Sequence, residues 1–231
     1  MRRRENRDME SKTEVNLELD KPIIDFEKLR GATLNEKPFR YLIAHSTIKP
    51  QWEDRLISGF PGLHKGGSFP LSTVKVENDF RGLIEEMESH EFRDFVEEKF
   101  SLRLSDRPTM FTVRGHCRLA DGKIHTDTQS KIITVLLYMN PRWAVDGGRL
   151  RILNQDTDIN DFAAELEPTI GTMLIFQRCD HSFHGHLPFE GERRVIQMNW
   201  VTEQRVVDRE SNRHKWSAFI KRFFHSRLTT A

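Results

Sequence analysis

The sequence predicts a mainly β domain, an antiparallel sandwich or barrel with helices packed against its outside. Three observations support this fold class. From residue 110 onward, short strand-like stretches follow one another, separated by clusters of glycine, aspartate, asparagine or proline. No helical pattern lies between these stretches, which favours antiparallel pairing. One long amphipathic segment precedes them, with apolar residues at helical spacing.

The N-terminal half contains the expected helices. Residues 1–20 are polar and charged without periodicity, and we expect a mobile tail. Residues 21–109 form a support region, with a strand within 38–48, a helix at 50–58 and one long helix at 79–100. The apolar face of the long helix comprises Leu83, Met87, Phe92, Phe95 and Val96.

The core of the domain is expected to span residues 110–203. The alternation and the turn residues between the segments predict seven strands. These are residues 110–118, 131–139, 149–153, 165–169, 172–176, 181–186 and 194–200.

Residues 204–231 are expected to form a basic amphipathic helix at the C-terminus. Its aromatic and aliphatic residues fall on one helical face, and lysines and arginines occupy the other. The apolar residues are Trp216, Phe219, Ile220, Phe223 and Phe224. Such a face could dock on the barrel, or the basic face could meet an anionic lipid or partner.

Composition excludes several classes of protein. A hydrophobic fraction of 37% supports a folded core, and a formal charge of +1 gives no indication of nucleic-acid binding. Two cysteines, Cys117 and Cys179, are too few for a disulfide framework. No apolar run approaches the roughly 20 residues that cross a bilayer, and the basic start lacks the apolar region of a secretion signal. We therefore expect a cytoplasmic location and no transmembrane segment.

Histidine and aspartate side chains form a candidate metal site. In a strand, residues two apart point to the same face, so His125 and Asp127 would converge. A third ligand would come from His181, His184 or His186. Two histidines and one carboxylate leave coordination positions open and are typical of non-haem iron(II) oxygenases, whereas zinc usually takes four ligands.

Several segments of the core resemble the prolyl-4-hydroxylase-like branch of the iron(II)- and 2-oxoglutarate-dependent oxygenases. They include His-Thr-Asp at 125–127, Tyr-Met-Asn at 138–140 and Gly-Gly-Arg-Leu at 147–150. Gly171 to Phe176, His184 and the strand from Arg194 to Trp200 follow in the order that the family uses. The resemblance implies a double-stranded β-helix, or jelly roll.

The resemblance also assigns roles to residues. It implies His125, Asp127 and His184 as metal ligands, since the family places the distal histidine about ten residues before an arginine that binds 2-oxoglutarate. Of the doublet Arg193-Arg194, the count back from Trp200 selects Arg194. Strand alternation then puts Arg194 on the face of Trp200, and Arg193 would point the other way or cap the turn.

Other residues are expected to complete the pocket. Tyr138 would contact the same carboxylate of 2-oxoglutarate as the arginine, and Thr134 would line the pocket on the same strand face. His186 would lie beside the iron. Where relatives have tyrosine or lysine on the preceding strand, this chain has Arg114 to Arg118, so Arg118 and His116 are candidates for the iron-side carboxylate.

The function implied by the resemblance is that of a hydroxylating dioxygenase. It would use iron(II), 2-oxoglutarate and O2, with ascorbate as a candidate reductant, and release succinate. The presence of Asp127 favours hydroxylation over halogenation. The substrate could be a protein, a small molecule, or a glycan or lipid. Two alternatives are a cupin-like metal-binding barrel with non-oxygenase chemistry and a catalytically silent binding module.

Overall fold

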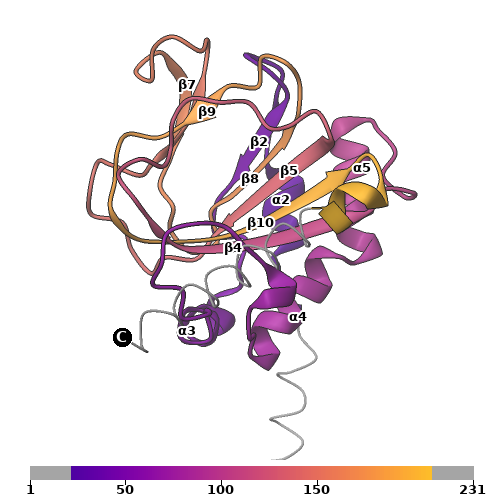
Figure 1. Cartoon of the computed structure of the whole chain (residues 1–231). Helices are drawn as coiled ribbons and strands as arrows, with labels where there is room; N and C mark the ends of the chain where they lie inside the picture. Colours follow the sequence, from indigo (N-terminus) through magenta and orange to yellow (C-terminus); the bar gives the residue numbers. More distant parts are fainter. Residues whose placement is uncertain (1–21, 210–231) are drawn as a thin grey trace, which may run out of the picture.

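Two antiparallel sheets form the centre of the protein (Figure 1). The computed structural model describes residues 22–209. The larger sheet has the strand order β1-β2-β8-β5-β10-β4-β3, and the smaller has the order β7-β6-β9. The strands are β1 (Leu34–Asn35), β2 (Tyr41–Ala44), β3 (Phe69–Pro70), β4 (Thr109–Cys117), β5 (Lys131–Tyr138), β6 (Leu150–Leu153), β7 (Phe162–Leu166), β8 (Met173–Gln177), β9 (His184–Gly185) and β10 (Gly191–Val201).

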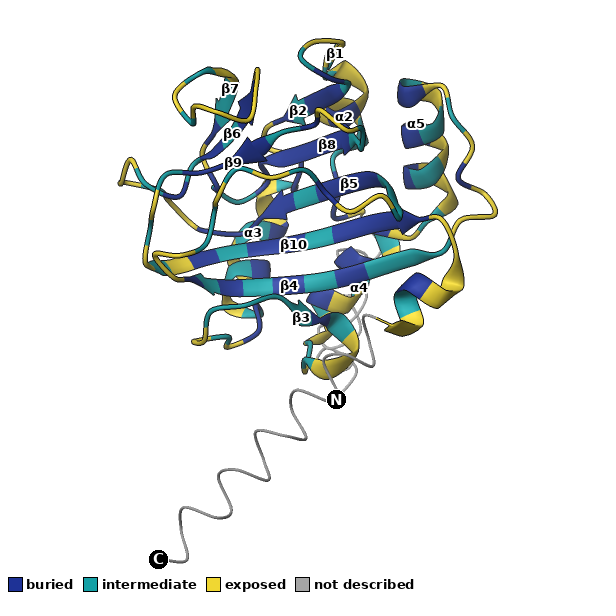
Figure 2. Cartoon of the chain, turned by 45° about the horizontal axis from the view of Figure 1, so that its top comes forward, coloured by how far each residue is buried: buried dark blue, intermediate teal, exposed yellow. Residues whose placement is uncertain are grey.

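The larger sheet is covered on one face by helices and on the other by the smaller sheet (Figure 2). In β10, Ile196, Met198 and Trp200 pack into the cluster that contains the helices. Val195 packs on the opposite face, with Leu150 of β6. The two sheets form two layers, and a cavity between them is lined by residues of both.

Helices precede the core strands as expected. They are α2 (Phe26–Gly31), α3 (Pro50–Ser58), the 3-10 turn η1 (Leu71–Thr73), α4 (Asn78–Met87) and α5 (His90–Phe100). The helix predicted at 50–58 is confirmed, but the single helix predicted at 79–100 is wrong. The Ser89 hydroxyl accepts a hydrogen bond from the Phe92 amide at 3.1 Å and starts a new helix, α5. A serine N-cap accepts from a backbone amide that has no partner in the first turn of a helix, so this bond marks the start of a second helix.

Most predicted strands are present, with different limits. β4, β5, β6, β8 and β10 overlap their predicted ranges, whereas the strand predicted at 165–169 is β7, which begins three residues earlier. The strand predicted at 181–186 shrinks to His184–Gly185. The strand predicted within 38–48 is β2, and β2 and β3 lie near the two edges of the larger sheet.

Two predicted segments lie wholly or mainly outside the described residues. The tail predicted at 1–20 is one, and the helix predicted at 204–231 is described only over 204–209, which are helical. No helix within 22–209 is long and apolar enough to span a membrane. The cytoplasmic location stays a prediction.

Candidate metal centre and co-substrate pocket

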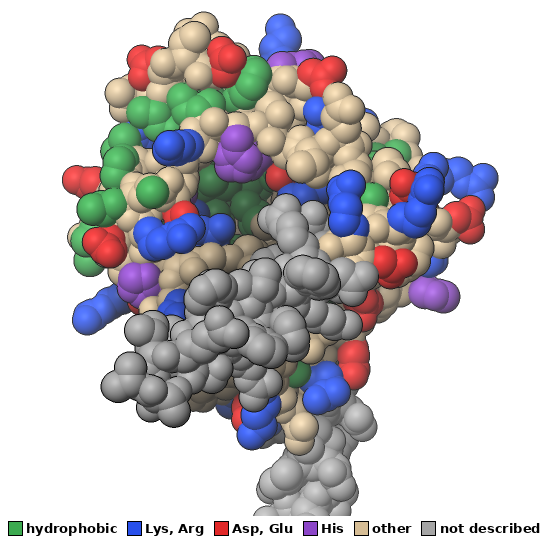
Figure 3. Space-filling model, viewed as in Figure 1, with side chains coloured by type: hydrophobic (Ala, Val, Ile, Leu, Met, Phe, Trp, Pro, Cys, Tyr) green, Lys and Arg blue, Asp and Glu red, His purple; other side chains and the backbone are tan. Residues whose placement is uncertain are grey.

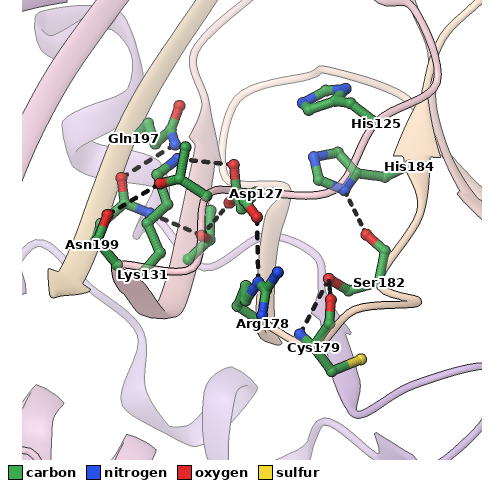
Figure 4. Close-up of polar contacts among 12 residues, drawn as sticks. His125, Asp127, Lys131, Arg178, Cys179, Ser182, His184, Gln197 and Asn199 are labelled. Carbon is green, nitrogen blue, oxygen red and sulfur yellow. Dashed lines mark hydrogen bonds and ion pairs between the residues drawn. The ribbon is translucent and has the colours of Figure 1, made fainter. Parts of the chain in front are cut away.

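His125, Asp127 and His184 meet between the two sheets (Figure 4). One potential ligand atom from each residue lies within 4.8 Å of the other two. His184 belongs to β9, and His125 pairs with it through two backbone hydrogen bonds of 3.0 and 3.1 Å. The expectation that 125–127 form a strand is wrong, because only this isolated bridge pairs the segment, yet the bridge brings both imidazoles together.

Backbone carbonyl groups orient both imidazoles. Nδ1 of His125 lies 2.8 Å from the Lys123 carbonyl oxygen, and Nδ1 of His184 lies 3.0 Å from that of Ser182. A carbonyl can only accept, so each Nδ1 carries the proton. In the neutral form of either ring, Nε2 is then unprotonated and available to a metal, which is the usual arrangement for ligating histidines.

Both carboxylate oxygens of Asp127 are held by donors on β5. Lys131 Nζ lies 2.7 Å from Oδ1, and the Thr134 hydroxyl donates to Oδ2 at 2.5 Å. The Asn199 amide donates to the Thr134 oxygen at 2.7 Å, so the hydroxyl proton points toward Asp127. Thr134 therefore lines the pocket as expected, and its hydroxyl contacts the candidate metal carboxylate.

The protonation states of the buried groups suit a cation. Burial and the nearby His125 ring lower the pKa of His184 from 6.5 to about 4. Burial alone would raise the pKa of Asp127, but Lys131 and His184, with the hydrogen bonds from Lys131 and Thr134, hold that pKa below its usual value. At neutral pH the site therefore offers the neutral imidazole of His184 and the carboxylate of Asp127, which together with the His125 ring form a donor set that fits iron(II).

A cavity of about 440 Å³ contains the three candidate ligands. Figure 3 shows a hollow on one face of the molecule, with basic side chains at its border. The residues that line the cavity come mainly from β4, β5 and β10, the loop before β5, and β9, with Leu150 from β6. They include Thr112, Arg114, Asp127, Lys131, Thr134, Tyr138, His184, His186, Arg193, Gln197 and Asn199. This volume is within the range of small-molecule sites.

Arg193, not Arg194, faces this cavity. Arg193 is 5% exposed; its Nε donates to the Gly148 carbonyl at 2.7 Å and its NH2 donates to the Tyr138 hydroxyl at 3.1 Å. Arg194 points to the other face of β10, where NH1 donates to the Ile57 carbonyl at 2.9 Å. The prediction that Arg194 shares the site is therefore wrong in its geometry, whereas Tyr138 lies where expected.

The alternation of β10 was predicted correctly, but its faces were assigned the wrong way round. Ile196, Met198 and Trp200 lie on the face of Arg194 and pack against the helices. The other face carries polar residues, Gln197 and Asn199. This contrast was a usable signal in the sequence, because a polar cavity favours the strand face that carries polar side chains.

The other two histidines considered as the third ligand differ in burial. His181 is exposed, whereas His186 is buried and lines the cavity. His186 donates from Nδ1 to the Leu187 carbonyl at 2.8 Å, and burial lowers its pKa to about 4. A Cβ on Gly122, at φ +84°, would lie 2.2 Å from the His186 ring, so only glycine lets this loop pass. The lining residues do not include Arg118 or His116.

Comparison with known families gives one match over the core of the chain. Residues 115–202 match the family model of the 2OG-Fe(II) oxygenase superfamily, a range that includes the three candidate ligands, Tyr138 and Arg193. The match covers 88 of the 231 residues, and over this part the chain is similar to that superfamily. No curated protein sequence matches the chain.

Solved structures of prolyl hydroxylases resemble this protein in fold. A prolyl 4-hydroxylase from Phytophthora capsici is 19% identical, and the match covers 86% of this chain and 75% of that chain with a TM-score of 0.51. A viral collagen prolyl hydroxylase from Paramecium bursaria Chlorella virus 1 is 15% identical, with coverages of 71% and 90% and a TM-score of 0.50. The prediction of a mainly β jelly roll with flanking helices is confirmed.

Proposed function

We propose that this oxygenase hydroxylates its substrate with iron(II), O2 and 2-oxoglutarate, and releases succinate. In this proposal His125, Asp127 and His184 bind the iron. Arg193 and Tyr138 bind the distal carboxylate of 2-oxoglutarate, so Arg193 takes the role that the sequence pattern gave to Arg194.

The observation that carries the proposal is one cavity containing both a three-donor metal centre and a buried arginine without a carboxylate partner. Within residues 22–209, no carboxylate oxygen lies within 4.0 Å of the Arg193 guanidinium. Burying a guanidinium without a counter-ion is costly, so its retention favours an anionic ligand. A planar guanidinium beside a tyrosine hydroxyl suits a carboxylate.

The protein groups divide the work between them. When bound, iron(II) and 2-oxoglutarate would activate O2, which is the oxidant of the reaction. The carbonyl contacts at Nδ1 would leave Nε2 of both imidazoles to bind the ion. Lys131 and Thr134 fix the Asp127 carboxylate, which limits how it can rotate. The Arg193–Tyr138 pair would orient 2-oxoglutarate with its keto acid toward the metal.

The test is iron-dependent release of succinate from 2-oxoglutarate, measured with ascorbate present. The wild-type chain should bind iron(II) and 2-oxoglutarate anaerobically and release succinate in air. His125→Ala and Asp127→Ala should abolish metal binding and turnover, because each removes one of three protein ligands. His181→Ala is the matched control, since this exposed histidine lies outside the cavity lining.

Two results would contradict the proposal. One is normal succinate release by either ligand variant. The other is a wild-type chain that binds metal but not 2-oxoglutarate, which would favour a metal-binding barrel with different chemistry.

A further inference from the structure

A second arginine lines the cavity from β4. Arg114 pairs across the strands with Val195, and Val195 pairs with Tyr138 on its other side. The side chains of Arg114 and Tyr138 both line the cavity. Arg114 therefore stands one strand beyond β10, on the side of the cavity toward the edge strand β3.

The guanidinium of Arg114 is only partly engaged. Its NH1 donates to Asp121 at 3.1 Å, whereas Nε and NH2 make no hydrogen bond with the residues of 22–209. Those two nitrogens form the edge with which arginine binds a carboxylate bidentately. Asp121 also accepts hydrogen bonds from the Arg118 backbone amide and from Arg118 NH2, so one carboxylate serves two guanidinium groups. An excess positive charge remains at Arg114.

The net charge of the residues that line the cavity also favours an anionic ligand. Among its lining residues, Arg114, Lys131 and Arg193 are cationic, and Asp127 is the one carboxylate in the described part of the chain. Iron(II) would add two positive charges, and 2-oxoglutarate would add two negative ones. The loaded cavity therefore keeps a positive excess, which attracts an anionic substrate.

We propose that the substrate of this oxygenase carries a carboxylate, which Arg114 binds through Nε and NH2. This inference rests on the proposed function, because the metal and 2-oxoglutarate set the charge balance. The carboxylate could belong to a small organic acid or to an acidic side chain in a peptide, and both present the same planar anion to the guanidinium.

The experiment uses matched acid and amide probes on the full chain, loaded anaerobically with iron(II) and 2-oxoglutarate. One arm compares N-acetylated amino acids with their carboxamides. The other compares capped Gly-Asp-Gly with capped Gly-Asn-Gly. Binding is measured by saturation-transfer NMR and calorimetry. Acids should bind at least about tenfold more tightly than amides, the usual worth of a charge-assisted hydrogen bond, and the stronger arm identifies the source of the carboxylate.

Variants assign the effect to Arg114. Arg114→Gln should remove the preference for acids, and Arg114→Lys, which keeps the charge but lacks the fork, should retain part of it. Arg118→Gln is the matched control, since its side chain is 61% exposed, shares Asp121 and lies outside the cavity lining. Affinity for 2-oxoglutarate should stay within about twofold of wild type in all three.

Equal binding of acids and amides, including no binding of either, would overturn the inference. So would equal losses in the Arg114 and Arg118 variants, or a loss of 2-oxoglutarate affinity in Arg114→Gln, which would place Arg114 in the co-substrate pocket. A chain that fails to load iron(II) and 2-oxoglutarate would instead contradict the proposed function.

Discussion

Replacing each of the two adjacent arginines in turn by glutamine tests which face of β10 forms the co-substrate pocket. Arg193→Gln and Arg194→Gln remove the same charge at neighbouring positions. The Arg193 side chain is buried beside Tyr138, whereas Arg194 donates to the Ile57 carbonyl and forms an ion pair with Glu192. Only the first should affect 2-oxoglutarate.

The size of the effect follows from burial. A carboxylate held by Arg193 would accept two charge-assisted hydrogen bonds, each worth about 1.5–3 kcal/mol. Because such contributions are not additive, we expect a total loss of about 3–4 kcal/mol, or about 10²- to 10³-fold in affinity for 2-oxoglutarate. Arg194→Gln should change that affinity by less than about threefold, because Arg194 faces the helices.

The assay is anaerobic calorimetry of 2-oxoglutarate binding, together with the KM for 2-oxoglutarate in succinate release. Arg193→Gln also leaves the Gly148 carbonyl and Tyr138 hydroxyl without their donor, so thermal unfolding of each variant must be measured alongside. Arg193→Lys keeps the charge and should lose less affinity than Arg193→Gln. A large loss in Arg194→Gln with little change in Arg193→Gln would refute the reasoning.

Two further predictions concern the metal centre. Thr134→Val, a change of similar shape, removes the donor to Asp127 Oδ2 and should weaken metal binding about 10- to 100-fold with little change in 2-oxoglutarate affinity; the opposite pattern in calorimetry would make Thr134 a co-substrate contact. The metal-free protein should lose stability as pH falls from about 6.5 to about 4. The pKa of His184 is near 4 in the folded chain and near 6.5 in the unfolded chain. Between these values only the unfolded chain takes up the proton, which favours unfolding. The contribution of His184 alone is about 2 kcal/mol between pH 7 and pH 5, and urea midpoints that do not fall over this range would contradict it.

Local chemistry in the sequence predicted much of the fold. Turn residues separate the core strands, and such signals act within a few residues of the chain. The sequence therefore identified the strands β4, β5, β8 and β10 and the helix Pro50–Ser58 directly. The break at Ser89 was missed because apolar spacing continues across it, although a serine at that position can begin a helix.

The sequence by itself also predicted the candidate metal centre, since the family resemblance implied His125, Asp127 and His184 as ligands, and the structure brings these three side chains together. Only the tertiary structure decided which arginine accompanies them. Alternation along β10 defines two faces, but it does not say which face meets the smaller sheet and which meets the helices. That choice depends on residues distant in sequence. Apolar side chains of the helices cover Ile196, Met198 and Trp200, so the opposite face of β10, which carries Arg193, lines the cavity.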